Sequence, residues 1–377
     1  MGCVPAPVTT PEKSSGSDAT PGGTGVSGGT GAAGGTGTPP PGRWRTWSNV
    51  LLAPSAPVLR RWALAGVVVS ALIILTGAAV RLSQSGLGCP DWPACTANSV
   101  GAAGATGDTL IHRWVEFGNR LVTVAISVVV IGVFIATWRF RPAGGVRRRD
   151  LVRLAAVQPA AILLQAVLGG IVVRTKLNPA LVSLHFLASV ALVAATVGLY
   201  VRCQEGPGRP RPFVPRTVQL AAIGIVGTVA LMMAAGTVVT GTGPLAGAAG
   251  VPRYQLPLEG VTQLHGDIGW LLAGLMVALL LGLRLTAAPP KAVRLGWLLL
   301  GLIGLQGVIG YTQYFTGLPA GLVWCHVAGS VAIWITALLL PYALRDRGSV
   351  IGPDVTAQEA APRQAAPAAT AGLTAGK

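Results

Sequence analysis

Apolar residues gather in eight long runs, which short polar connections separate. The runs cover about residues 61–82, 114–138, 152–173, 180–202, 216–239, 262–285, 292–314 and 320–344. Each run is roughly 20 residues long, enough to cross about 30 Å of hydrocarbon at about 1.5 Å per residue. The pattern therefore predicts an all-α membrane protein with eight transmembrane helices.

Two stretches of the chain match at a fixed offset. Gln165 and His185 flank one short loop, Gln306 and His326 flank another, and the separation from Gln to His is the same in both. We interpret the match as a duplication that gives two pseudo-symmetric four-helix bundles, 61–205 and 206–345, because four spans return the chain to its starting side. The alternative is that membrane helices simply resemble one another.

Basic residues gather in the connections on one side of the predicted membrane. The loops after the second, fourth and sixth runs carry most of them, and the opposite connections hold few: Arg174, Lys176 and Arg253, with Arg81 and Arg113 at helix ends. This positive-inside distribution predicts that both termini are cytoplasmic. The net charge of +16 could indicate a nucleic-acid surface, but arginines scattered over separate short loops argue against that partner.

The two ends of the chain differ in composition from the runs. Residues 1–42 are mainly Gly, Thr, Pro, Ser and Ala, and residues 348–377 are rich in Ala, Pro and Thr. Such segments contain too few apolar side chains to bury a core. We expect disordered cytoplasmic tails over 1–60, with a basic end next to the membrane, and over 346–377. The first tail has no apolar region typical of a signal peptide.

Cys89 and Cys95 flank Pro-Asp-Trp-Pro-Ala in the first outer loop. An oxidising compartment allows them to pair, and five intervening residues with two prolines can bring the sulfurs within bonding range. Zinc binding is less favoured because no second cysteine pair could complete a site. We predict a disulfide, with a structural and a redox-active role both open.

The four histidines of the chain are His112, His185, His265 and His326, near the starts of the second, fourth, sixth and eighth runs. Even-numbered helices start on the same side, so all four imidazoles should lie near the outer face. Neutral imidazole is a good ligand for haem iron, and a bundle core can present two from facing helices. We predict His265 and His326 as such a pair. The alternative is hydrogen bonding between packed helices.

The first half of the duplication is less regular. His185 corresponds to His326, but Asn119 stands opposite His265, and His112 lies two turns earlier. Glu116 lies between them, and the three share one face if the helix extends that far. A buried carboxylate here could stabilise a developing cation or move a proton. Alternatively, Glu116 forms a salt bridge with Arg120 or Arg113, and the two readings are compatible.

Together these residues resemble the haem A synthase family, over about residues 61–345. The resemblance rests on Gly88-Cys89-Pro90-Asp91-Trp92-Pro93 with Cys95, Glu116-x-x-Asn119-Arg120, Leu184-His185, Thr240-Gly241-x-Gly243-Pro244, His265 and His326. Members of this family are membrane enzymes that oxidise the C8 methyl of haem O to a formyl group. The composition, rich in Gly, Ala and Arg, suggests an actinobacterial-like version.

The resemblance implies roles for individual residues. His265 and His326 would ligate a prosthetic haem b, His185 would hold the substrate haem O, and Glu116 would be the catalytic carboxylate. The family commonly has histidine where this chain has Asn119, and also where it has Leu245. Asparagine is a poor haem ligand, so either His185 acts alone or His112 substitutes. Seven residues of helix displace His112 by about 10.5 Å, so a direct exchange requires the helix to begin after His112.

The resemblance also implies a setting in the cell membrane of a bacterium, where the product haem A serves terminal oxidases. Candidate partners are haem O synthase, cytochrome oxidase assembly factors, an electron donor and membrane lipid. The main alternative function is a bis-histidine haem b cytochrome that transfers electrons without modifying haem. A duplicated transporter is a further alternative, and it fits poorly with histidines that all lie on one side.

Overall fold

The computed structural model describes residues 54–96, 99, 101–102, 107–142 and 147–348, which lie within one compact unit, Arg43–Lys377. Most of the two expected tails, 1–53 and 349–377, lies outside the described residues. Residues 56–60, which the tail prediction included, are instead the start of the first helix. The N-terminal boundary was therefore placed too late.

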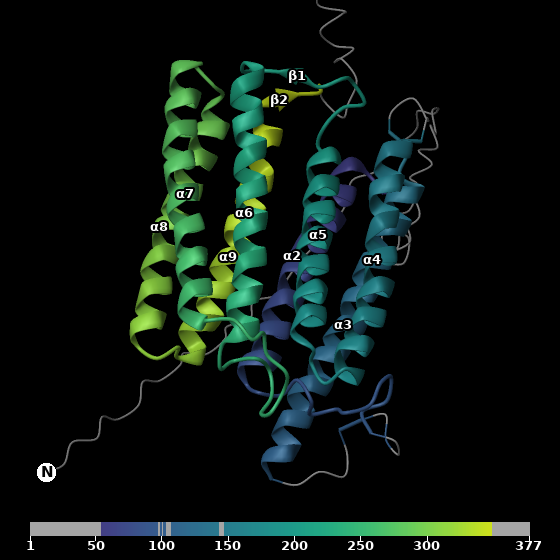
Figure 1. Cartoon of the computed structure of the whole chain (residues 1–377). Helices are drawn as coiled ribbons and strands as arrows, with labels where there is room; N and C mark the ends of the chain where they lie inside the picture. The colour runs from purple at the N-terminus through teal and green to yellow at the C-terminus, as the bar shows by residue number, and fades with distance from the viewer. Residues whose placement is uncertain (1–53, 97–98, 100, 103–106, 143–146, 349–377) are drawn as a thin grey trace, which may run out of the picture. The chain divides into compact units, whose positions relative to one another are not determined.

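Eight of the described helices are long and apolar enough to cross a membrane, which confirms the predicted all-α class and the number of spans (Figure 1). They are α2 (Ala56–Leu82), α3 (Asp108–Arg139), α4 (Arg149–Arg174), α5 (Pro179–Arg202), α6 (Arg216–Thr242), α7 (Leu258–Leu285), α8 (Pro290–Phe315) and α9 (Ala320–Ala343). Two short strands, β1 (Arg211–Pro212) and β2 (Arg345–Asp346), pair antiparallel.

Helix α3 differs most from its predicted bounds, because it begins at Asp108 rather than near residue 114. Hydropathy detects only the apolar part of a helix, and residues 108–113 include Asp, His and Arg. Polar residues can continue a helix beyond the hydrocarbon, since the backbone hydrogen bonds remain local. His112 therefore lies within the helix and not in the preceding loop.

The helices contact one another in the same order in the two halves of the chain. In the first half, α2 and α4 each pack against both α3 and α5, and in the second half α6 and α8 each pack against both α7 and α9. The two sets meet where α5 packs against α6 and α9, and where α2 packs against α9. This order is compatible with two duplicated bundles, and the domain assignment stays a prediction.

Helix α9 is fixed to the first half by two tryptophans. Trp334 Nε1 donates to the carbonyl of Val190 at 2.9 Å, and Trp324 Nε1 donates to the carbonyl of Leu75 at 3.1 Å. The largest buried cluster includes Val193 of α5 and Leu272 of α7, so apolar packing continues across the boundary between the halves. A second cluster, which includes Val133 of α3 and Leu151 of α4, holds the first half together.

Short connections make successive helices run in opposite directions, so the unit has two ends (Figure 1). The disulfide end carries the Cys89–Cys95 loop and the starts of α3, α5, α7 and α9. The strand end carries β1 and β2. Each of the four histidines lies in the first part of one of these four helices. The fold thus gathers the imidazoles near the disulfide end, as the sequence predicts.

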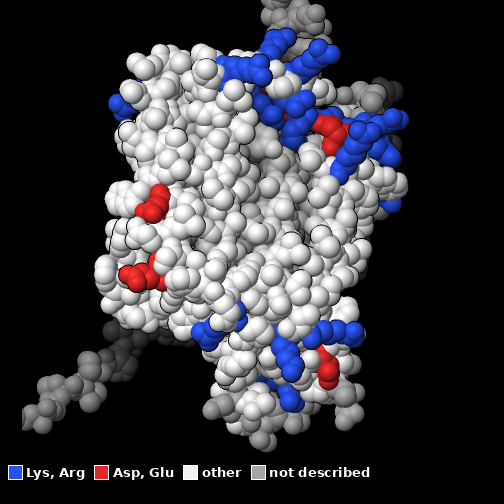
Figure 2. Space-filling model, viewed as in Figure 1, with Lys and Arg blue, Asp and Glu red and all other residues white. Residues whose placement is uncertain are grey.

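A charged network joins the halves at the strand end. Asp150 Oδ2 pairs with Arg148 at 2.7 Å and Arg202 at 2.5 Å, while Glu205 pairs with Arg202 at 2.6 Å and Arg345 at 3.2 Å. Figure 2 shows basic side chains gathered at this end, with fewer at the disulfide end and a mostly uncharged band between. Such a band is typical of a protein that crosses a membrane.

Candidate functional site

In the second half, His265 of α7 and His326 of α9 face each other. Their ring centres are 6.2 Å apart and their planes are inclined by 65°. Both side chains are half-buried. Two metal–imidazole bonds of about 2 Å each fit within this separation. The pair is therefore suited to hold one metal ion from opposite sides.

Each of three histidines rests against a glycine of the preceding helix. A Cβ at Gly236 would lie 3.3 Å from Cε1 of His265, and one at Gly310 would lie 3.4 Å from Cε1 of His326. The first half repeats the contact, with 3.5 Å from a Cβ at Gly169 to Cε1 of His185. A Cβ would be tight against the ring at Gly236 and in van der Waals contact with it at Gly310 and Gly169, so each imidazole lies close to its glycine.

The ring nitrogens have few protein partners. The Nδ1 atoms of His185 and His326 are buried and have no hydrogen-bond partner among the described residues. Nδ1 of His265 is buried likewise, with the Met232 backbone beside it. No group of three or more His, Cys, Asp or Glu that could hold a metal ion occurs in the described ranges. Two imidazoles fit a metal whose other ligands come from a macrocycle such as haem.

In the first half, Glu116 lies buried in α3, with its residue only 5% exposed. One carboxylate oxygen accepts a hydrogen bond from the backbone N–H of Cys89 at 2.7 Å, and the other pairs with Arg120 Nη2 at 2.7 Å. The salt bridge to Arg120 that we considered as an alternative is thus present. It leaves a chemical role open, because a paired carboxylate still carries negative charge.

Arg120 also fixes the loop in which the cysteines lie. Its guanidinium donates to the carbonyls of Cys89, Asp91, Pro93 and Ala94 at 3.0–3.3 Å. Cys89 and Cys95 form the predicted disulfide. The loop is therefore closed on itself and anchored to α3 through charge-assisted hydrogen bonds.

His112 does not take the position of Asn119. Both lie on the continuous helix α3, and His112 Nδ1 shares a hydrogen bond of 2.9 Å with Ser85 Oγ. The condition for a direct exchange, a helix that begins after His112, is not met. The Oδ1 atom of Asn119 is buried with no hydrogen-bond partner among the described residues, so the amide has capacity for a further contact.

Sequence reasoning missed several parts of this site. It did not identify the contacts of Gly169 and Gly310, although both stand at matching positions of the two stretches, equally far before His185 and His326. It also missed the contact of Arg81 at the end of α2, whose Nε donates to the carbonyl of Leu245 in the loop between α6 and α7 at 2.8 Å. No pattern in the sequence indicated that contact, because the two residues are far apart along the chain.

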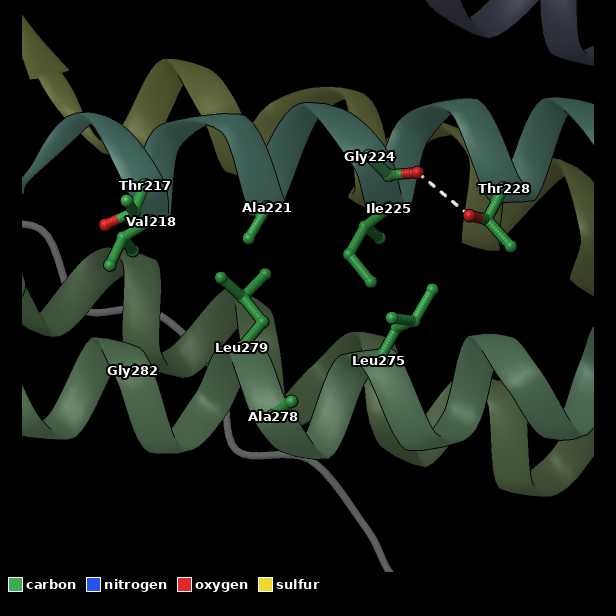
Figure 3. A pocket seen from close by; sticks show the side chains of 10 residues that line it. All are labelled: Thr217, Val218, Ala221, Gly224, Ile225, Thr228, Leu275, Ala278, Leu279 and Gly282. Carbon is green, nitrogen blue, oxygen red and sulfur yellow. Dashed lines mark hydrogen bonds between the residues drawn. The ribbon is translucent and has the colours of Figure 1, made fainter.

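A separate groove lies between α6 and α7, nearer the strand end (Figure 3). Its lining is largely apolar: Thr217, Val218, Ala221, Gly224, Ile225, Thr228, Leu275, Ala278, Leu279 and Gly282. The Thr228 hydroxyl donates to the Gly224 carbonyl at 2.9 Å and is thereby satisfied. The groove contains neither histidine nor a charged group, so it is not part of the site.

Known proteins match most of the chain. The COX15-CtaA family model, described as cytochrome oxidase assembly protein, matches residues 60–338. A Heme A synthase from Shewanella oneidensis is 24% identical over 326 residues, covering 74% of this chain and 94% of that protein. A Heme A synthase from Lysinibacillus sphaericus is 33% identical over 132 residues, covering 34% and 39%. One from Listeria welshimeri is 29% identical over 140 residues, covering 37% and 43%.

Proposed function

The chain belongs to the COX15-CtaA family of cytochrome oxidase assembly proteins, and on that premise we propose that it oxidises the C8 methyl of haem O to the formyl group of haem A. The observation that carries the proposal is the facing pair of His265 and His326, 6.2 Å apart. Relatives named Heme A synthase support the same reaction. The chain is a multi-pass membrane protein, so a lipophilic haem can reach it from the bilayer.

The second half holds the prosthetic group in this proposal. His265 and His326 would hold a haem b, and their imidazoles lie against Gly236 and Gly310. Bound haem b supplies one-electron transfer. Two ligands from different helices hold the group firmly, which suits a cofactor that stays bound through many turnovers.

The first half takes the substrate. His185 is the main ligand to the substrate haem, because its ring is positioned on Gly169 with Nδ1 not engaged. Asn119 contributes an amide in place of a second imidazole, and His112 lies towards the haem edge or its propionates. A single strong ligand holds less firmly than two, which suits a molecule that must leave after each turnover.

Glu116 is the catalytic carboxylate in this scheme. With dioxygen as oxidant and electrons from a donor, the reaction balances as R–CH3 + 2 O2 + 4 H+ + 4 e− → R–CHO + 3 H2O. Hydrogen is removed from the methyl carbon in this reaction, so positive charge can develop near that carbon and protons must move. A carboxylate fixed by Arg120 and the Cys89 N–H can stabilise that charge or accept a proton without reorganising. Both anchors are short, at 2.7 Å, and they keep the carboxylate from turning away.

The orientation follows from charge. Basic residues concentrate at the strand end, so we place that end and both termini in the cytoplasm of a bacterial cell. The disulfide end then faces the oxidising side, where the Cys89–Cys95 bond is stable. An electron donor, haem O synthase and oxidase assembly factors are the partners that this reaction requires or serves.

Haem chromatography of the purified protein, before and after incubation with haem O and a reductant in air, tests the proposal. We expect bound haem b at the start and haem A afterwards. Glu116→Gln provides a matched control that should keep haem b and form little haem A. A protein that holds haem b but leaves haem O unchanged would instead be an electron-transfer cytochrome.

A further inference from the structure

The two halves differ in the side chains that join two neighbouring helices. We call the boundary between α3 and α4, and the corresponding boundary between α7 and α8, the seam of each half. In the second half, Trp270 of α7 donates its Nε1–H to the hydroxyl of Tyr311 on α8 at 3.1 Å. Tyr311 follows Gly310, against which His326 rests. A direct side-chain bridge therefore joins α7 and α8 on an exposed side of the helices, where Trp270 is 66% and Tyr311 is 51% exposed.

The first half cannot form this bridge. The fixed offset between the halves aligns Gly170 with Tyr311, and the alignment of Asn119 with His265 places Val124 opposite Trp270. Neither glycine nor valine has a side-chain hydrogen-bonding group. Another element must close the seam between α3 and α4.

Trp92, from the disulfide loop, occupies the space that Gly170 leaves. A Cβ at Gly170 would lie 2.6–3.0 Å from ring atoms of Trp92, closer than any real Cβ contact. The indole thus packs directly on the backbone of α4, one residue from Gly169 and its contact with His185. A substitution that adds even a methyl group at Gly170 must displace this ring.

The loop that carries Trp92 is attached to both helices of the seam. Arg174 of α4 donates to the Trp92 carbonyl at 3.3 Å. On the other side, Arg120 and Glu116 of α3 hold the loop backbone. The disulfide closes the same loop. The loop therefore forms a strap across α3 and α4 at the disulfide end.

We propose that Trp92, seated on Gly170, closes the α3–α4 seam and controls the entry and exit of the substrate haem. The proposal rests on the function proposed above and names the exchange route for the same site. The second half differs in how its helices are joined. The bridge between Trp270 and Tyr311 joins two helices and would have to break for them to separate, whereas the Trp92 side chain can turn off Gly170 while Arg120, Arg174 and the disulfide keep the loop backbone in place.

The release of haem O to excess apomyoglobin tests this route directly, because it does not depend on catalysis. The full chain in nanodiscs is loaded with haem O, and transfer is followed optically under non-turnover conditions. We expect Trp92→Ala and Gly170→Ala to accelerate release at least about tenfold, since each removes the packed indole from the seam. The haem O release rate of Trp92→Phe should lie between the rates of these variants and that of the wild type.

Two controls make the result specific to the first half. Trp297→Ala removes another exposed tryptophan, near the strand end, and should leave both release rates unchanged. Trp270→Ala should accelerate loss of the resident haem b and leave haem O release unchanged. Haem b that stays bound in the Trp92 and Gly170 variants shows that the fold is intact. If Gly170→Ala loses haem b, the haem O release rate of Trp92→Ala tests the proposal instead.

Unchanged or slower haem O release in Trp92→Ala would overturn the proposal, and so would equal acceleration of haem O and haem b release. Failure of the wild-type protein to bind either haem is a different outcome, because it would overturn the proposed function itself. The two failures are therefore distinguishable in a single set of measurements.

Discussion

The two halves of the chain use one helix arrangement for two local environments. In the second half, His265 faces His326, and Trp270 bridges to Tyr311 beside them. In the first half, His185 keeps its place against a glycine, but the histidine opposite becomes Asn119. A buried carboxylate and an anchored loop are added there instead. The difference shows that matching helix contacts can keep a ring against its glycine while the residues around it change.

In the proposed function, the second half retains a bound cofactor and the first half binds a substrate that reacts and leaves. A group that stays bound benefits from two ligands and a closed seam, whereas a substrate needs a single exchangeable ligand and a removable cover. Among the described residues, the buried carboxylate is Glu116, where turnover is proposed. Asp267, two residues after His265, is exposed and accepts from Gln263 at 2.8 Å. Substitutions can remove each of these differences between the halves in turn.

The largest expected effect concerns the ligand pair. His265→Ala or His326→Ala should lower the affinity for haem b more than about a hundredfold, because losing a direct ligand exceeds the 10- to 100-fold typical of supporting residues. Haem content and the reduced optical spectrum measure the loss. A low-spin spectrum that persists in both variants would contradict the assignment and remove the main difference between the halves.

The next effect should be confined to the first half. His185→Ala should abolish haem O binding and haem A formation while haem b stays bound, since the two imidazole sites lie on different helices. His112→Ala should be milder, because its Nδ1 is engaged with Ser85 Oγ. Binding titrations with haem O compare the variants. If His112→Ala lost haem O binding as completely as His185→Ala, two histidines would bind the substrate haem in the first half.

Glu116→Gln should reduce haem A formation by about 10²- to 10⁴-fold, the range that a positioned proton-transfer group contributes. The amide oxygen can still accept from the Cys89 N–H, so the loop should remain anchored. Arg120→Lys is the matched control, because it keeps the charge but loses the fork that binds several carbonyls. If Glu116→Gln keeps near-normal turnover and Arg120→Lys does not, Glu116 serves only to hold Arg120.

Much of this arrangement follows from the sequence. Eight apolar runs predict the helices, and alternating direction places four histidines at one end. Spacing in the repeat pairs His185 with His326. The sequence could not reveal that Trp92 packs on Gly170 or that Arg81 reaches Leu245, because those contacts join segments with no shared periodicity. It also placed the start of α3 too late, since hydropathy does not report polar helical turns.

A smaller effect is expected from making the halves more alike. Asn119→His places an imidazole opposite His185, where the duplication has one. We expect haem O to bind more tightly and to become low-spin, and turnover to fall because product release slows. Optical spectra of the loaded variant measure the spin state. An unchanged spectrum would mean that Asn119 and His185 do not approach the same iron, and that the first half departs from the second in backbone as well as side chain.

The smallest effect should come from reducing the Cys89–Cys95 bond. Arg120 still holds four carbonyls of the loop, so we expect haem O release to accelerate less than in Trp92→Ala, with haem b unaffected. Alkylation and mass spectrometry verify the redox state, with both thiols labelled only after reduction.

Cys203 is an internal control, because burial raises the pKa of its thiol to about 12. At pH 8 that thiol is protonated and unreactive in the folded protein, so labelling of Cys203 would reveal unfolding. If reduction accelerated haem O release as strongly as Trp92→Ala, the disulfide and not the Arg120 contacts would hold Trp92 on Gly170.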